Sequence, residues 1–301
     1  MDGLSNGNFG STISVISIKF NALWGGIMTD VILNKLDSLR SVVRGYGSCL
    51  VAYSGGVDSA LLTVVTHEQL GDRMLAVIAD SPSLPRRELS EAKLLAEEHG
   101  IPLHVLHTSE FQNPDYQSNP VNRCFYCKHE LFTHLKLLAS DRSINVIVYG
   151  ENTSDLGDWR PGAEAAAKFE VRSPLKEAGL SKENIREIST YLGLSTADKP
   201  QMPCLSSRIP YGQEVTPEKV GMIEKAEFFL RDMGFNEVRV RHHESGPVAR
   251  IEVVPEQLDQ LRVEETFEAV RASFTRIGYA EVQVDEQGYR RGSLNPSEIK
   301  I

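Results

Sequence analysis

The chain has 301 residues, a formal net charge of −9 and an apolar share of 41%. Such a length accommodates one large or two modest domains, and this apolar share is ordinary for a globular protein. The acidic balance argues against nucleic acid as a partner, because the basic footprint of nucleic-acid-binding proteins is missing. No apolar run approaches the roughly 18 residues of a membrane span, so we expect no membrane partner.

Residues 1–27 differ from the rest of the chain, since they are rich in Gly, Ser and Asn and carry one basic residue, Lys19. A secretory signal would need a basic start and a longer apolar core than residues 13–18 provide. We therefore expect 1–27 to be a disordered extension and the protein to be cytoplasmic.

From residue 30 onward, apolar helical patterns alternate with short apolar runs that are typical of buried strands. Strands separated by helices of this length predict a mostly parallel sheet with helices on both faces, a doubly wound α/β fold. The expected strands are 50–53, 73–80, 103–107 and 145–149, and the expected helices are 32–43, 61–70, 86–98 and 128–139.

Four prolines between residues 200 and 217 interrupt this alternation. The pattern beyond them predicts a helix, two strands, a mostly helical stretch and a last strand, at 218–233, 237–241, 248–254, 257–277 and 280–284. We therefore expect an α/β domain at 28–205 and a smaller α+β domain at 206–301.

A serine- and glycine-rich turn, Ser54-Gly55-Gly56-Val57-Asp58-Ser59, joins the first predicted strand to the next helix. Its glycines let the backbone turn sharply and approach a ligand without a Cβ atom in the way. Amides of the turn and of the first helical turn then point at one spot, which favours a phosphate chain. Asp58 is a candidate cap or Mg²⁺ ligand. The lysine-containing Walker pattern is absent, and the alternative is a turn that binds nothing.

Two further strand ends carry the polar segments Asp80-Ser81 and Gly150-Glu151-Asn152. Ligands of parallel sheets bind beyond the carboxyl ends of the strands, so these segments and the glycine turn should converge on one crevice. As single residues, Asp80 and Glu151 are also common in plain turns.

The chain has four cysteines. In a protein kept reduced, they point to metal binding or catalysis before disulfides. Cys49 begins the first strand and is most simply a core residue. Cys124 and Cys127 lie three residues apart just ahead of a predicted helix, and Cys204 lies in the proline-rich connector. Three thiolates fit an iron–sulfur cluster with one open iron, because such clusters are held by thiolates, typically four. Three unrelated thiols are the alternative.

Several motifs occur together in this chain. The turn at 54–59 resembles the PP-loop of the ATP pyrophosphatases, and with the motifs after it the chain resembles the LarE family over residues 28–295. These motifs are Asn122-Arg123-Cys124-x-x-Cys127-Lys128, Gly150-Glu151-Asn152 with Asp155 and Asp158-x-Arg160-Pro161-Gly162, Cys204-Leu205-Ser206-Ser207-Arg208-Ile209-Pro210-Tyr211-Gly212, Arg239-Val240-Arg241-His242 and Ala249-Arg250-Ile251-Glu252.

The resemblance implies an adenine nucleotide alpha hydrolase-like fold and an ATP-dependent sulfur transferase. LarE proteins make the nickel-pincer nucleotide cofactor used by lactate racemase and related enzymes. ATP adenylylates a carboxylate of pyridinium-3,5-biscarboxylic acid mononucleotide and releases pyrophosphate, and sulfur then replaces AMP to give the thiocarboxylate. The implied partners are this small-molecule nucleotide substrate, further copies of the chain in a homo-oligomer, and a sulfur donor system.

The resemblance also implies roles for single residues. Sulfur comes either from Cys204 itself, which is left as dehydroalanine, or from a [4Fe-4S] cluster on Cys124, Cys127 and Cys204; the presence of three thiols favours the cluster. The ATP site would comprise Ser54, Gly55, Gly56, Asp58, Ser59, Asp80 and Gly150, with Asp58 holding Mg²⁺. Cys204, Ser207 and Glu227 would serve sulfur transfer, although Glu227 could equally be an exposed helix residue.

Positive charge is needed to hold a substrate with a phosphate and two carboxylates, and arginine forks match such oxygens. The resemblance therefore assigns Asp158 and Arg160 to the substrate pocket, with Arg208, Arg239 and Arg241 as further substrate-binding residues. Arg239 and Arg241 share a face in strand alternation, and without the family that face is as readily a solvated one.

Two other functional classes share the Ser-Gly-Gly-x-Asp-Ser start. A PP-loop tRNA thiolase should carry a basic surface, against which the charge of −9 counts; an amide-forming synthetase of the NAD or GMP synthetase kind would not need one. A non-enzymatic protein that senses nucleotides or stores metal would bind ATP without turnover.

Overall fold

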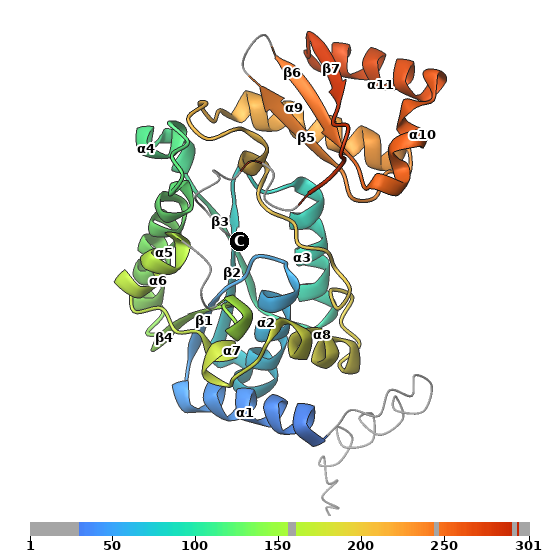
Figure 1. Cartoon of the computed structure of the whole chain (residues 1–301). Coiled ribbons are helices and arrows are strands. Elements are labelled where there is room, and N and C mark those ends of the chain that lie inside the picture. The colour runs from blue at the N-terminus through green and yellow to red at the C-terminus, as the bar shows by residue number, and fades with distance from the viewer. Residues whose placement is uncertain (1–29, 156–160, 244–246, 291–293, 295–301) are drawn as a thin grey trace, which may run out of the picture.

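The computed structural model describes residues 30–155, 161–243, 247–290 and 294. At its centre lies a four-stranded sheet in the order β3-β2-β1-β4, in which every neighbouring pair is parallel. The strands are β1 (Cys49–Ala52), β2 (Met74–Asp80), β3 (Leu103–His107) and β4 (Val146–Tyr149) (Figure 1). The expected parallel α/β sheet is therefore confirmed.

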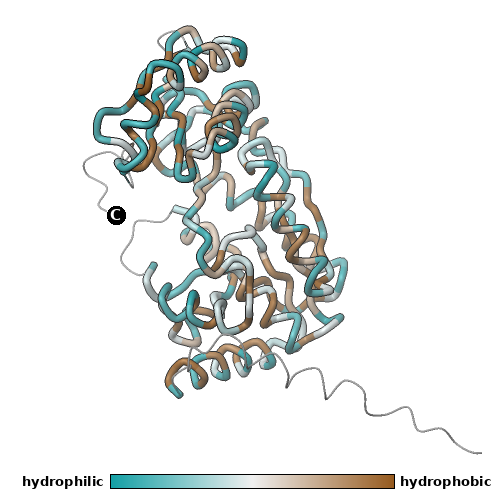
Figure 2. The backbone as a smooth tube through the Cα atoms, turned by 90° about the vertical axis from the view of Figure 1, so that its right-hand side faces the viewer, coloured by the Kyte–Doolittle hydropathy of each residue, from teal (hydrophilic) through white to brown (hydrophobic). Residues whose placement is uncertain are grey.

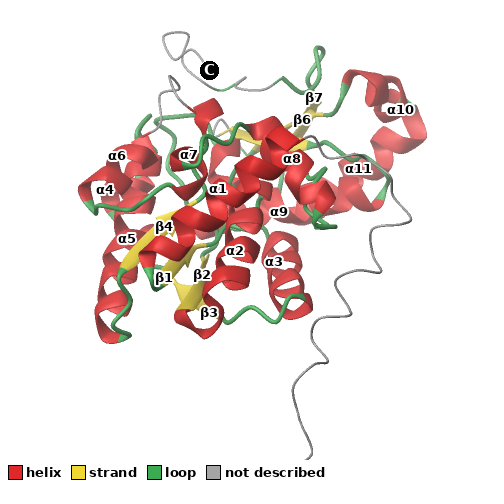
Figure 3. Cartoon of the chain, turned by 90° about the horizontal axis from the view of Figure 1, so that it is seen from below, coloured by secondary structure: helices red, strands yellow, loops and turns green. Residues whose placement is uncertain are grey.

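Helices cover both faces of this sheet (Figure 3). The residues of β1 alternate between two cores, since Val51 packs into one and Leu50 and Ala52 pack into the other. The first core is closed by α1 (Asp30–Tyr46), α2 (Val57–Leu70), α3 (Arg86–Glu98), α7 (Pro174–Glu177) and α8 (Lys182–Tyr191), and the second by α5 (Arg123–Asp141) and α6 (Pro161–Lys168).

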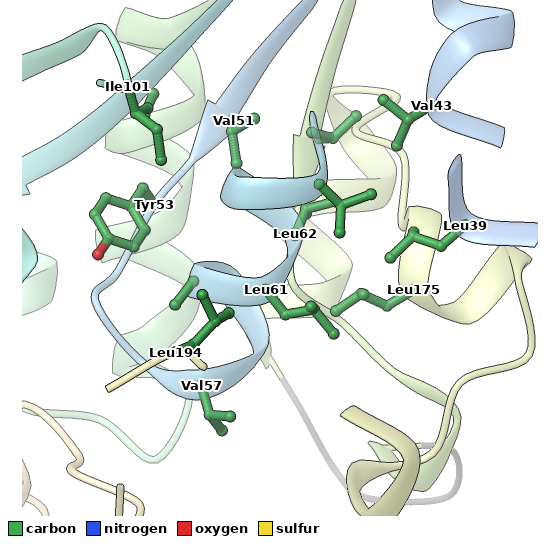
Figure 4. Close-up of a cluster of buried hydrophobic side chains, with 14 of the residues drawn as sticks. Leu39, Val43, Val51, Tyr53, Val57, Leu61, Leu62, Ile101, Leu175 and Leu194 are labelled. Atoms are coloured by element: carbon green, nitrogen blue, oxygen red, sulfur yellow. The ribbon is translucent and has the colours of Figure 1, made fainter. Parts of the chain in front are cut away.

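Helix α1 shows why the sequence pattern predicts its place. Ile32, Leu36, Leu39 and Val43 recur at the spacing of one helical face, and all four are buried. Hydrophobic and hydrophilic residues accordingly alternate along this helix at the bottom of Figure 2. In the close-up of the first core, Leu39 and Val43 lie beside Leu62 of α2 (Figure 4).

A second sheet lies in the C-terminal part of the chain, shown in orange and red in Figure 1. Strand β6 (Val248–Glu252) pairs antiparallel with β5 (Arg239–His243) and parallel with β7 (Glu281–Val284). Its apolar core includes residues of α9 (Pro217–Asp232), α10 (Leu258–Arg262) and α11 (Glu264–Ile277). The predicted order of elements is observed, whereas the boundary at 205/206 stays a prediction.

Two expectations about the first part of the chain need correction. Helix α5 begins at Arg123, so Cys124 and Cys127 lie in its first turns and not ahead of it. Helix α8 was missed, although Ser181 and Asn184 form a capping box at its start and Ile185 and Ile188 are buried. Hydrogen bonds of the helix with its own caps explain the second miss, because such local signals are weaker than a long apolar stripe.

Some expectations cannot be compared with the structure. The extension at 1–27 and the residues Asp158 and Arg160 lie outside the described residues. Within the described ranges, none of the helices combines the length and apolarity that crossing a membrane requires.

Gly150 follows β4 and packs directly against the start of α2. A Cβ atom at this position would lie 2.9 Å from the amide nitrogen of Ser59 and 3.2 Å from the carbonyl carbon of Asp58. These contacts are with backbone atoms, which cannot swing aside as a flexible side chain can. Gly150 therefore sets how closely the end of β4 approaches the glycine turn.

We predict that Gly150→Ala lowers the free energy of unfolding by about 1–3 kcal/mol, because overpacking displaces neighbouring backbone. Urea unfolding would measure the change. The matched control is Gly45→Ala, since a Cβ at Gly45 of α1 meets no atom within 4 Å, and we expect it to leave stability unchanged or to raise it by about 1 kcal/mol. Equal effects of the two substitutions would contradict the packing argument.

Candidate functional site

The glycine turn at 54–59 has the geometry of an anion site. Gly55 has a φ of +75°, and a Cβ there would lie 3.1 Å from that of Ala92, so both conformation and space favour glycine. Gly56 precedes α2 and supplies no side chain to cap its first turn. The amides at the start of α2 therefore remain without a side-chain cap, and their dipoles favour a phosphate group.

Two serines close this turn. The hydroxyl of Ser59 accepts a hydrogen bond from the amide of Ser54 at 3.1 Å and donates to the carbonyl of Gly56 at 3.1 Å. The two serine hydroxyls lie 2.9 Å apart. The structure thus brings Ser54, Gly55, Gly56 and Ser59 together as the sequence predicts, and it adds Gly150 behind them.

Asp58 has a partner that the sequence analysis missed. The ammonium group of Lys182, the first residue of α8, lies 2.6 Å from one carboxylate oxygen of Asp58. The amide of Asn152 donates to the other oxygen at 3.2 Å. Neither side chain of the ion pair is fully buried. A carboxylate and an ammonium group beside uncapped amides can bind Mg²⁺ and phosphate oxygens respectively.

Asp80 ends β2, next to the strand that feeds the glycine turn. Its carboxylate accepts a hydrogen bond from Arg86 at 2.5 Å and lies 3.7 Å from Nδ1 of His107. Glu151 at the end of β4 accepts hydrogen bonds from Tyr149 and Ser173 instead. These contacts hold both carboxylates at the carboxyl edge of the sheet, where the sequence analysis placed the crevice.

Lys199 links the glycine turn to the connector that carries Cys204. Its ammonium group lies 2.8 Å from Glu88 and 2.9 Å from Glu91, both on α3, and 3.3 Å from the carbonyl oxygen of Gly55. Partial burial would raise the pKa of Glu91, but hydrogen bonds from Arg87 and Lys199 hold it below its usual value. Lys199 is another residue that the sequence analysis missed.

The three candidate ligand thiols are neighbours. Burial, and then the nearby Cys204, raise the pKa of Cys124, while the charge of Arg123 opposes this rise. Burial also raises the pKa of Cys127, with smaller contributions that include Glu110, Cys204 and Cys124. Such effects fall off with distance, so the thiols of α5 and of the connector lie close together. Cys49 is buried in the first core, as expected.

Within the described part of the chain, no three His, Cys, Asp or Glu side chains converge closely enough to hold a metal ion. The donor set of Cys124, Cys127 and Cys204 still suits a cluster, because each thiolate of an iron–sulfur cluster binds a different iron and the ligands need not converge on one point.

Arg208 and Glu227 form a fully buried pair behind Cys204. Two guanidinium nitrogens of Arg208 donate to Glu227 at 2.8 and 3.1 Å, and the third donates to the carbonyl oxygens of Pro203 and Cys204. Burial alone would raise the pKa of Glu227, but the charge and hydrogen bonds of Arg208, together with the charge of Arg231, lower it to about 2. Glu227 is not the exposed helix residue that the sequence left open.

Arg239 and Arg241 are also buried, so the alternative of a solvated face is wrong. Arg241 donates to the carbonyl oxygen of Ser207 at 3.1 Å and pairs with Glu252 at 2.6 Å. Arg239 donates to the carbonyl oxygen of Gln201 at 3.2 Å. Both arginines therefore bind the connector on either side of Cys204.

Comparison with known proteins agrees with these observations. The chain is 43% identical over 262 residues to the uncharacterized protein slr1717 of Synechocystis, covering 87% of this chain and 97% of that protein. It is 30% identical over 267 residues to pyridinium-3,5-bisthiocarboxylic acid mononucleotide synthase of Lactiplantibacillus plantarum, covering 88% of this chain and 95% of the synthase. The chain belongs to this synthase family, LarE.

A more distant similarity extends over part of the chain. It is 29% identical over 214 residues to a polypeptide of the glutamine-hydrolyzing GMP synthase of Archaeoglobus fulgidus, covering 66% of this chain and 69% of that polypeptide. This relative supports membership of the wider PP-loop superfamily. No family model matches the chain.

We predict that Glu227→Gln lowers the free energy of unfolding by about 3 kcal/mol near neutral pH, because it leaves the charge of Arg208 buried and unpaired. A carboxylate whose pKa is lowered by folding stabilises the protein above its unfolded-state pKa and loses this effect as pH falls toward the folded-state value. The difference from wild type should therefore shrink as pH falls below about 4.5 toward about 2.

Denaturant unfolding at several pH values would measure this difference, with Glu98→Gln at the exposed end of α3 as the control. A difference between wild type and Glu227→Gln that does not change with pH would show that the buried charge pair is not its cause.

Proposed function

We propose that this chain is an ATP-dependent sulfur transferase that converts pyridinium-3,5-biscarboxylic acid mononucleotide into its thiocarboxylate during nickel-pincer cofactor synthesis. The supporting observation is that one connector joins a phosphate-type glycine turn, through Lys199, to a group of three neighbouring thiols, through Cys204. The similarity to the synthase of Lactiplantibacillus plantarum extends over both.

The first step activates a carboxylate, whose negative charge otherwise repels nucleophiles. A carboxylate oxygen of the substrate attacks the α-phosphorus of ATP, and the bond to the β-phosphate oxygen breaks to release pyrophosphate. Amides of the glycine turn and the ammonium group of Lys182 would stabilise the charge that develops on pyrophosphate. Asp58 would hold Mg²⁺, which adds further stabilisation of this charge.

The second step replaces AMP by sulfur. An anionic sulfur attacks the acyl carbon, and AMP leaves with the electron pair of the broken C–O bond. Cys204 would deliver this sulfur either from its own side chain, which becomes dehydroalanine, or as a ligand of a cluster shared with Cys124 and Cys127. A [4Fe-4S] cluster at these residues would supply a labile sulfide, so that the protein can turn over repeatedly.

The buried arginines suit orientation of the connector better than direct contact with the substrate. Arg208 has no exposed surface, and its donors are occupied by Glu227 and by the connector. We therefore propose that Arg208, Arg239 and Glu227 are positioning residues for Cys204, while Ser207, Arg241, Asp158 and Arg160 are proposed to border the substrate pocket.

The decisive experiment measures pyrophosphate and thiocarboxylate after ATP, Mg²⁺ and the pyridinium nucleotide are added to the purified chain. We expect both products, and Lys182→Gln should reduce pyrophosphate formation by roughly tenfold or more, as loss of a transition-state charge contact does. The exposed Lys136→Gln on α5 is the matched control. Pyrophosphate release with tRNA alone, or with no acceptor at all, would refute the proposal.

Iron and acid-labile sulfide distinguish the two sources of sulfur. After anaerobic purification, the wild-type chain should contain both, and Cys124→Ala should contain neither and lose repeated turnover while still binding ATP. Intact-mass analysis after turnover provides the opposing outcome: a loss equal to the mass of H₂S at Cys204 would identify the sacrificial route and refute the cluster.

A further inference from the structure

The segment that carries Cys204 is held along its length by three buried side chains that precede Cys124. These are Tyr116 in α4 (Pro114–Gln117), Asn119 in the following loop and Arg123 at the start of α5. Each is 3% exposed or less. We call these three residues the clasp. The sequence patterns give no sign of it, because its partners lie more than 80 residues further along the chain.

Asn119 makes the central contacts of the clasp. Its side-chain amide donates to the carbonyl oxygens of Ile209 and Pro210 at 3.2 and 2.8 Å, and its own backbone carbonyl accepts from the amide of Gly212 at 2.9 Å. Its side-chain oxygen also accepts a hydrogen bond from Arg123. Asn119 has a φ of +53°, a conformation that asparagine tolerates better than most residues other than glycine.

Arg123 and Tyr116 hold the turn that directly follows Cys204. Arg123 donates to the carbonyl oxygen of Ser206 at 3.0 Å, and its guanidinium lies 5.9 Å from the ring centre of Tyr211. The hydroxyl groups of Tyr116, Ser83 and Ser206 form a closed, buried triangle of hydrogen bonds. The carbonyl of Ser83 also accepts from the amide of Leu205 at 2.8 Å.

The position of the clasp in the chain gives these contacts a purpose. Arg123 is adjacent to Cys124 and one helical turn from Cys127, so the same residues that bind the 205–212 segment also lead into the helix with the other two thiols. Buried hydrogen bonds are short and directional, and losing one leaves an unsatisfied polar group. The clasp therefore fixes the spacing between Cys204 and the thiols of α5.

We propose that the clasp is a positioning device for sulfur transfer: it holds Cys204 in register with Cys124 and Cys127 and has no part in ATP activation. Its effect on turnover rests on the proposed function, whereas its effect on thiol spacing does not. A reacting group displaced by about 1 Å can lose roughly 100-fold in rate. Damage to the clasp should thus uncouple the two half-reactions.

The test compares Asn119→Gly with Ser143→Gly. Glycine keeps the positive φ at both positions, and Ser143 has a similar φ of +52° but lies between α5 and β4, away from the connector. For each full-length variant, the amount of thiocarboxylate formed per pyrophosphate released is measured. We expect this ratio to fall roughly tenfold or more in Asn119→Gly, with pyrophosphate release unchanged, and to stay at the wild-type value in Ser143→Gly.

A second measurement needs no turnover. Diamide oxidises neighbouring thiol pairs to disulfides and is itself reduced to the hydrazine; peptide mapping of chelator-treated protein then gives the yield of the Cys204 links to Cys124 and Cys127. We expect this yield to fall in Asn119→Gly and to be unchanged in Ser143→Gly. Unchanged links in Asn119→Gly, or fewer links with an unchanged product ratio, would overturn the proposal.

Tyr116→Phe replaces Asn119→Gly if the latter fails to fold, since it removes one hydroxyl and keeps the ring contact with Phe111 at 5.2 Å. If wild type releases no pyrophosphate with the pyridinium nucleotide, the proposed function fails, and the disulfide yields still decide whether the clasp sets the thiol spacing.

Discussion

The candidate site depends on the guanidinium of Arg208, which has no contact with solvent. A buried charge is tolerated only when it is paired and its hydrogen bonds are satisfied. Here Glu227 of α9 meets one side of the guanidinium, and carbonyl oxygens around Cys204 meet the other. The pair therefore binds the connector to the C-terminal sheet, and any movement of Cys204 would expose or unpair a charge.

Positive charge in this acidic chain is concentrated where anions would bind. The net charge is −9, yet buried or half-buried cations lie beside the glycine turn, as Lys182 and Lys199 do, or beside the connector, as Arg208, Arg239 and Arg241 do. Each makes a specific contact with a carboxylate or a carbonyl oxygen. Charges held in this way are pre-oriented, which is what electrostatic stabilisation of a developing anion requires.

The two ends of the proposed reaction are mechanically connected. Lys199 binds the carbonyl of Gly55 at one end of the connector, and Asn119 and Arg123 bind the segment after Cys204 at the other. The Cys204 segment is consequently anchored from both directions to elements of the parallel sheet domain. Activation and sulfur delivery can then share one substrate position without a large movement of the chain.

Much of the fold could be predicted because its signals are local. The apolar period of α1, the continuous apolar run of β1 and the glycine turn before α2 each extend over a few residues, and each element lies where the pattern predicts. The proximity of the strand ends followed from the general geometry of parallel sheets. The start of α5 was placed too late, because its first turn carries cysteines and aromatic residues instead of an apolar stripe.

The sequence by itself therefore determined the parallel sheet, the phosphate-type turn and the presence of three thiols. Only the tertiary structure decided that Lys182 pairs with Asp58 across 124 positions of sequence, that Glu227 neutralises Arg208, and that Asn119 binds the segment after Cys204. The physical reason is range: turn chemistry and helical periodicity act between near neighbours in the chain, whereas a buried charge pair or side-chain clasp exists only once the sheet has brought distant segments together.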